Sequence, residues 1–313
     1  MKGLELAEAY FHEHGLPMLR AEFPGLLPHL AAGLVGSGSE CMGYDDEIST
    51  DHDFEPGFCL FLPDEEVVDS RTAFRLERAY AALPSEFHGY RRAPLSPVGG
   101  NRHGVIRLSE FLLARTGSPT GEPSLCEWLA LPEQSLLEVT NGKVFYDGPG
   151  LLTAARRRLS YLPEDARLKR LAGHVLLAGQ AGQYNYPRCL LRGDTAAAQL
   201  SVIEFSKSIL AVIFLLNATY APYYKWCFRA ARELPILGDL TESLEYLISS
   251  PNTGDVGMRK RAMCEEIAAR VAVGLCEGGV SDFAGEVLEG HAYAVNSRIR
   301  DGALRNLPIL YGV

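Results

Sequence analysis

Two glycine–serine pairs, Gly36-Ser37 and Gly38-Ser39, close an apolar run that begins at residue 30. Glycine lets the backbone approach a ligand closely, and serine hydroxyls together with backbone N–H groups at the start of a helix can hold phosphate oxygens. The same residues are also typical of a tight turn between a strand and a helix. The pairs therefore indicate either a phosphate-binding loop or a plain turn, and the residues that follow must decide between the two.

Two aspartates, Asp51 and Asp53, follow these pairs and are separated by one residue. On an extended segment, side chains two positions apart point to the same side, so the two carboxylates would lie next to each other. Like charges held together in this way repel unless a cation lies between them, and Mg²⁺ prefers such hard oxygen ligands. The alternative is a solvated acidic loop, the class to which we assign Asp45, Asp46 and Glu47.

The order of these features resembles the signature of the nucleotidyltransferase superfamily, in which a hydrophobic-Gly-Ser segment precedes Asp-x-Asp or Asp-x-Glu. Here the glycine–serine pairs stand about a dozen residues before Asp51. The resemblance implies that the serines contact nucleotide phosphates and that the two aspartates hold Mg²⁺, or Mn²⁺ in its place. His52 departs from the pattern, because the middle position is usually apolar, whereas Asp53-Phe54-Glu55 satisfies it in a shifted register.

Further segments extend the resemblance over most of the chain. The string GKVFYDGPG at 142–150 resembles the element that ends the catalytic domain of many small nucleotidyltransferases, and the second half is similar in layout to the substrate-binding bundles of aminoglycoside nucleotidyltransferases. The strings GSGSECMGYDDEISTDHDF, LLEVTNGKVFYD, YLPEDARLKRLA and AGQYNYPRCLLRGD resemble a bacterial family known only as domain of unknown function 4037. The resemblance implies a fold, a superfamily and a nucleoside triphosphate donor, ATP or another, but no particular acceptor.

Superfamily enzymes usually carry a third carboxylate on a later strand, as a metal ligand or as the base for the attacking hydroxyl. The matching segment here, 104–108, contains no acid. Three glutamates are candidates in its place: Glu110 just beyond that segment, Glu138 in LLEVT, which resembles the base-bearing segment of streptomycin-type adenylyltransferases, and Glu204 in the second half. Without a base the fold could bind nucleotide yet turn it over slowly, because general-base catalysis contributes about 10²–10⁴-fold.

Polar and aromatic residues gather at two places in the second half. The segment AGQYNYPRCLLRGD holds Tyr184, Asn185 and Arg188 between two predicted helices, and crowded polar groups at such a junction can line a substrate cleft. The segment NATYAPYYKW holds Lys225, whose ammonium group could reach the phosphates of a bound nucleotide. A turn that caps helix ends explains the first group equally well, and core packing explains most aromatic residues of the second.

The elements that would position these residues differ between the two halves. Apolar runs of strand length at 30–36, 58–63 and 103–109 alternate with helical patterns at 64–83, whose first turn is acidic, and at 131–142. Beyond residue 150, helical periods broken by Pro, Gly and Asn cover 150–183, 194–220, 223–235, 241–249 and 259–279. We predict a nucleotidyltransferase-like α/β domain with a mixed sheet over 1–150, followed by an all-α helical bundle that binds substrate over 151–313.

The 313 residues carry a formal net charge of −9, which disfavours nonspecific binding to the phosphate backbone of a nucleic acid. The N-terminal residues MKGLELAEAYFHEHG carry acidic side chains where a signal peptide needs a basic start and an apolar run. The longest apolar run, ILAVIFLL at 209–216, is far shorter than the roughly 20 residues that span a bilayer. Seven scattered cysteines form no CxxC pair and no cluster at zinc spacing. We expect a cytoplasmic protein with reduced thiols and with no nucleic-acid or membrane partner.

These patterns predict a Mg²⁺-dependent transfer of a nucleoside monophosphate, AMP from ATP, to a small-molecule acceptor. Two alternatives remain open. One is a nucleotide-binding or regulatory protein that keeps the fold without turnover, suggested by the acid-free segment 104–108. The other is a helical interaction module that uses the string QYNYPR, with the first domain in a structural role.

Overall fold

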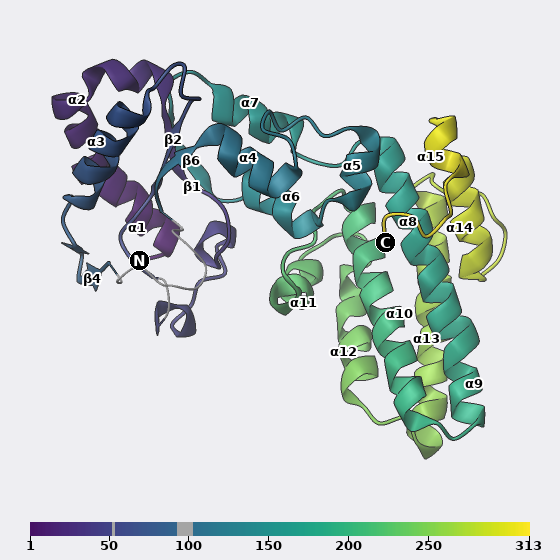
Figure 1. The fold of residues 1–313 in the computed structure, drawn as a ribbon. Coiled ribbons are helices and arrows are strands. Elements are labelled where there is room, and N and C mark those ends of the chain that lie inside the picture. The colour runs from purple at the N-terminus through teal and green to yellow at the C-terminus, as the bar shows by residue number, and fades with distance from the viewer. Residues whose placement is uncertain (52–53, 93–102) are drawn as a thin grey trace. The chain divides into compact units, whose positions relative to one another are not determined.

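The computed structural model describes residues 1–51, 54–92 and 103–313 (Figure 1). Internal contacts divide the chain into two compact units: unit 1 consists of Met1–Pro123 and Ser135–Ser160, and unit 2 of Ser124–Gln134 and Tyr161–Val313. A short segment of the first half thus belongs to the second unit. The domain boundary near residue 150 stays a prediction, because compactness alone does not define a domain that folds independently.

A four-stranded mixed sheet in the order β5-β2-β1-β6 forms the centre of unit 1. The strands are β1 Ala31–Leu34, β2 Cys59–Leu62, β5 Gly104–Arg107 and β6 Lys143–Asp147. β1 is antiparallel to both β2 and β6, whereas β2 and β5 are parallel. Every residue of β1 and β2 is buried, as their unbroken apolar sequence requires. The three predicted strands are confirmed, each shorter than its apolar run, and β6 is part of the GKVFYDGPG string.

Helices and short ribbons surround this sheet. They are α1 Gly3–Tyr10, the π-helical η1 Phe11–Gly15, α2 Leu16–Glu22, the 3-10 helices η2 Pro24–His29, η3 Glu40–Met42 and η4 Ile48–Asp51, then α3 Ser70–Ala81, α4 Leu108–Thr116, α6 Glu133–Thr140, α7 Leu151–Arg158 and the hairpin strands β3 Glu86–Phe87 and β4 Tyr90–Arg91. The helix predicted over 64–83 begins later than expected, because Asp69 caps it by accepting a hydrogen bond from the Thr72 amide at 2.7 Å. The acidic residues at 64–66 therefore precede the helix instead of forming its first turn.

Phe58, one residue before β2, lies in the core of unit 1. Its ring centroid is 5.2 Å from that of Phe11 and 5.0 Å from that of Tyr80. The Tyr80 hydroxyl accepts a hydrogen bond from the Phe58 amide at 3.0 Å and donates one to the Phe58 carbonyl at 2.8 Å. Both backbone groups are thereby paired in an apolar setting, where each would cost about 1–3 kcal/mol if left unpaired. Burial raises the pKa of Tyr80, so its hydroxyl stays protonated and can donate.

Unit 2, all of whose residues the structure describes, contains helices and no strand. These are α5 Leu125–Ala130, α8 Glu164–Ala178, the π-helical η5 Gly179–Asn185, α9 Tyr186–Leu191, α10 Thr195–Leu216, α11 Tyr224–Arg232, the 3-10 helix η6 Gly238–Leu240, α12 Thr241–Ser249, α13 Gly254–Glu277, α14 Leu288–Ser297 and α15 Gly302–Asn306. Figure 1 shows α8, α10, α12 and α13 running side by side, with α10 packed against the other three. The predicted fold class, a mixed sheet with helices followed by a helical region, is confirmed.

The apolar run ILAVIFLL lies in α10, which is long and apolar enough to cross a membrane by length and composition alone. Core helices of soluble proteins meet the same criterion. Here Phe205, Ile209 and Ile213 are completely buried, and they recur at the spacing of one helix face. The run therefore forms part of a helix whose apolar face is buried inside unit 2.

Candidate functional site

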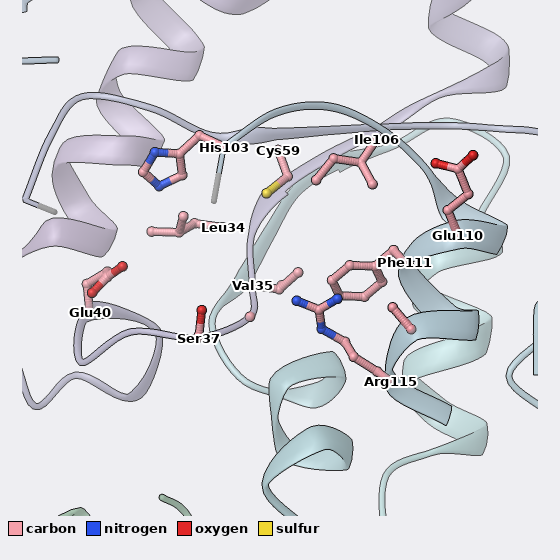
Figure 2. A pocket seen from close by; sticks show the side chains of 12 residues that line it. Leu34, Val35, Ser37, Glu40, Cys59, His103, Ile106, Glu110, Phe111 and Arg115 are labelled. Carbon is pink, nitrogen blue, oxygen red and sulfur yellow. The ribbon is translucent and has the colours of Figure 1, made fainter. Parts of the chain in front are cut away.

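A cavity of about 260 Å³ lies in unit 1, where β1 ends and β2 and β5 begin (Figure 2). Leu34 and Val35 at the end of β1, Cys59 of β2 and Ile106 of β5 form part of its apolar wall, and α4 adds Phe111. Its polar lining residues are Ser37, Glu40, His103, Glu110 and Arg115. Polar groups from segments far apart in the sequence therefore converge on one hollow beside the sheet.

The glycine–serine turn forms one side of this cavity. Gly36 and Gly38 have φ values of +119° and +130°, which residues with a Cβ rarely adopt, so both glycines are required by backbone conformation. Ser37 lines the cavity, and Figure 2 shows its hydroxyl directed into it. Ser39 is the N-cap residue of η3, a helix of only three residues. Of the four residues predicted to bind nucleotide here, Gly36 and Ser37 line the cavity.

Arg115, in the last turn of α4, is a cavity residue that the sequence analysis missed. Its guanidinium carbon lies 4.1 Å from the centroid of the Phe111 ring. Its Nε is 3.5 Å from Glu138 Oε2, and a Cβ placed on Gly36 would lie 3.6 Å from its Nη2. The side chain is thus held by a ring and a carboxylate while its outer nitrogen faces the glycine–serine turn. Its segment, EFLLART, is mostly apolar, and the sequence analysis assigned no role to it.

The candidate bases occupy different surroundings. Glu138, on α6, forms the ion pair with Arg115 and is not among the cavity-lining residues. Glu110, in the first turn of α4, is exposed and lines the cavity, on the opposite side from Ser37 and Glu40 in Figure 2. Glu204 belongs to unit 2 and pairs with Lys207 at 3.7 Å, an ordinary i, i+3 helix pair. Glu110 is therefore the one of the three that the structure places in the cavity wall.

The predicted metal ligands fall at the edge of what the structure describes. Asp51 is the last residue of the 3-10 helix η4, so its backbone is not extended as the sequence analysis assumed, and its side chain is not described. Asp53 lies outside the described residues. Among the residues that the structure does describe, no group of three or more His, Cys, Asp or Glu side chains could hold a metal ion. The paired orientation of the two aspartates therefore stays a prediction.

The residues predicted in the helical half are separated within unit 2. Tyr184 lies on the π-helical segment η5 and Arg188 on α9, which follows it directly, so the two residues do not form a capping turn. Arg188 Nη1 donates to the Tyr184 hydroxyl at 2.6 Å, and Asn185, between them in the sequence, is exposed. This group lies beside the middle of α10, since Gly182 packs on Phe205. Lys225 lies on α11, which follows the C-terminal end of α10, and its Nζ is 5.2 Å from the centroid of the Trp226 ring. The helix rises about 16 Å from Phe205 to its end, so the two groups are not brought together.

Comparison with known proteins gives one result. Residues 128–227, about a third of the chain, match the family model described as Domain of unknown function (DUF4037). No curated protein and no solved structure matches the chain. The family part of the predicted resemblance is confirmed over the matched residues, and membership of the nucleotidyltransferase superfamily stays a prediction.

Proposed function

We propose that the chain is a cytoplasmic, Mg²⁺-dependent nucleotidyltransferase that transfers a nucleoside monophosphate, AMP from ATP, to a small-molecule acceptor. The cavity in unit 1 carries this proposal, because a glycine–serine turn and the guanidinium of Arg115 meet there. Guanidinium groups bind phosphate oxygens through short, charge-assisted hydrogen bonds. A volume of about 260 Å³ is small for a complete ligand, so it fits the triphosphate, with the nucleoside projecting outward.

In this proposal the chain's own residues bind and orient the triphosphate. The Ser37 hydroxyl and the Arg115 guanidinium hold non-bridging phosphate oxygens from two sides of the cavity. Asp51 and Asp53 would hold the metal ion, which when bound offsets negative charge on the phosphates. The donor chemistry of the cavity fits such an ion, because the carboxylate of Glu40 supplies the kind of hard oxygen ligand that Mg²⁺ prefers.

Transfer forms a bond between the acceptor's hydroxyl oxygen and the α-phosphorus. The bond from the α-phosphorus to the bridging oxygen breaks, and pyrophosphate leaves with that electron pair. The hydroxyl proton passes to a base, a role that we assign to Glu110, which is exposed in the cavity wall. Glu138 is the weaker candidate because Arg115 already neutralises its carboxylate.

A nucleotide-binding protein with little turnover is the second candidate function. The observation that favours it is β5, whose residues Gly104–Arg107 include no carboxylate, together with the pairing of Glu138. Pyrophosphate release from ATP, Mg²⁺ and a mixture of hydroxyl-bearing acceptors separates the two functions. A transferase releases pyrophosphate in proportion to acceptor consumed and loses this release in Glu110→Gln, whereas a binding protein releases none above a protein-free control.

Replacing Arg115 by alanine is expected to weaken ATP binding by at least about tenfold, because a hydrogen bond to a charged group contributes about 1.5–3 kcal/mol. Titration calorimetry with ATP and Mg²⁺ measures this effect. Arg115→Lys keeps the charge but loses the fork of donors, so its ATP affinity should lie between that of wild type and that of Arg115→Ala. Arg78→Ala, an exposed arginine of α3, is the control and should bind as wild type does. Equal ATP affinity of wild type and Arg115→Ala would exclude Arg115 from the phosphate site.

A further inference from the structure

The end of α6 is fixed to the glycine–serine turn by the pairing of β1 with β6. In this antiparallel pair Leu34 lies opposite Lys143. Continuing the same register for two residues beyond each strand end brings Gly36 opposite Asn141. There the Asn141 side chain takes the place of a strand partner: its Oδ1 accepts from the Gly36 amide at 3.0 Å, and its Nδ2 donates to the Gly36 carbonyl at 2.7 Å. Both backbone groups of Gly36 are thus paired with one carboxamide.

The next residue, Gly142, holds the other end of the turn. Its amide donates to the Cys41 carbonyl at 2.8 Å. Its φ is +61°, and a Cβ at this position would lie 1.9 Å from the Leu34 carbonyl oxygen, so no other residue fits here. Asn141 and Gly142 together therefore fix the segment from Gly36 to Cys41 at both ends.

Arg156, on α7, in turn fixes the end of α6. Its Nη1 donates to the carbonyls of Val139 at 2.9 Å and Asn141 at 2.7 Å, and its Nη2 donates to the Thr140 carbonyl at 2.8 Å. These are carbonyls that a helix leaves without intrahelical partners at its C-terminus, where a positive charge is also favourable. Only the planar guanidinium, with donors in a fixed fork, can reach all three at once.

We propose that Asn141 and Arg156 are positioning residues of the phosphate-binding turn. Arg156 fixes the backbone at residue 141, and Asn141 fixes the Gly36 peptide. Because the Gly36 amide already donates to Asn141, the turn contacts the ligand through the hydroxyl of Ser37, which lines the cavity. Neither positioning residue touches the phosphates, and the inference rests on the proposed function of the cavity.

Hydrogen exchange of the Gly36 amide tests the first contact without any ligand. In wild type this amide should be protected, and in Asn141→Ala it should exchange at least about tenfold faster, because its acceptor, Asn141 Oδ1, is removed. Asn141→Asp keeps the acceptor oxygen and should keep the protection. Amides of the buried strand β2 report on overall folding and should not change. Unchanged exchange at Gly36 in Asn141→Ala would overturn the inference, and Asn141→Ser replaces the alanine variant if that does not fold.

ATP affinity tests the second step. Asn141→Ala and Arg156→Lys should each raise the dissociation constant for ATP with Mg²⁺ by about tenfold or more, a change that calorimetry resolves easily. Arg157→Lys, an exposed neighbour on α7, is the matched control and should bind as wild type does. Wild-type affinity in both variants would overturn the inference. If wild type itself binds no nucleotide, the proposed function fails, and the Gly36 exchange rate alone decides the positioning role.

Discussion

Replacing Arg170 by methionine is expected to lower the free energy of unfolding by about 3–5 kcal/mol, the usual cost of removing one partner of a buried ion pair. Arg170, on α8, is only 6% exposed. Its Nη1 lies 3.3 Å from Glu133 Oε1, and its Nη2 donates to the carbonyls of Trp128 at 3.0 Å and Leu129 at 3.1 Å, and to that of Leu131. Methionine fills similar space but leaves the three carbonyls without this donor, and it leaves the Glu133 carboxylate with the Ala221 amide, 2.8 Å from Oε2, in place of a charged partner.

Urea unfolding followed by helix content measures this loss. Arg261→Met, an exposed arginine on α13, is the control and should stay within about 0.5 kcal/mol of wild type. Adding Glu133→Gln to Arg170→Met should recover part of the stability, because the double variant no longer buries an uncompensated charge. A loss below about 1 kcal/mol in Arg170→Met would show that Arg170 does not hold segment 124–134 in unit 2.

Acidification is expected to destabilise unit 2 through His174, a largely buried residue of α8. Burial, assisted by the positive charges of Arg170 and Lys207, lowers the pKa of His174 from 6.5 to about 4. Its Nδ1 is buried and makes no hydrogen bond to any described residue. Between pH 6.5 and 4 the unfolded chain binds a proton that the folded protein does not, so stability falls as the pH is lowered through this window. The loss is about 3 kcal/mol, because one pKa unit is worth about 1.4 kcal/mol.

The pH dependence of unfolding in His174→Gln isolates this contribution. The difference in unfolding free energy between wild type and the variant should change by about 3 kcal/mol from pH 7 to pH 4 and little below pH 4. Relative to the variant, wild type is more stable at pH 7 than at pH 4. The same substitution at the exposed His12 is the control for the effect of replacing a histidine by glutamine. Parallel curves for wild type and His174→Gln would contradict the assigned shift.

The elements that could be predicted from sequence are those fixed by local pattern. β1 and β2 follow from unbroken apolar runs that end at glycine or proline, and α10 follows from the helical spacing of Phe205, Ile209 and Ile213. The start of α3 was placed too early because several acidic residues precede it, and only the hydrogen bond from the Thr72 amide identifies Asp69 as the cap.

The contacts that build the candidate site could not be predicted in the same way. The glycine–serine turn was visible as a motif, but Asn141 binds Gly36 from 105 residues away. That contact depends on the register of β6 against β1, which no local pattern in either strand specifies. Arg115 was missed for the same reason: its role depends on α4 packing beside the turn that contains Gly36. Local spacing identified the turn, and long-range pairing supplied its partners.

A thermal-shift screen of the full chain against ATP, GTP, CTP and UTP, each with and without Mg²⁺, tests the proposed function most directly. We predict that ATP raises the unfolding midpoint by several degrees, since a ligand at a hundredfold excess over its dissociation constant adds about 2.7 kcal/mol to the stability of the folded state. The rise should require Mg²⁺ and should disappear when Asp51 and Asp53 are both replaced by asparagine. No shift with any nucleotide, or an equal shift in the doubly substituted protein, would contradict a metal-dependent nucleotide site in unit 1.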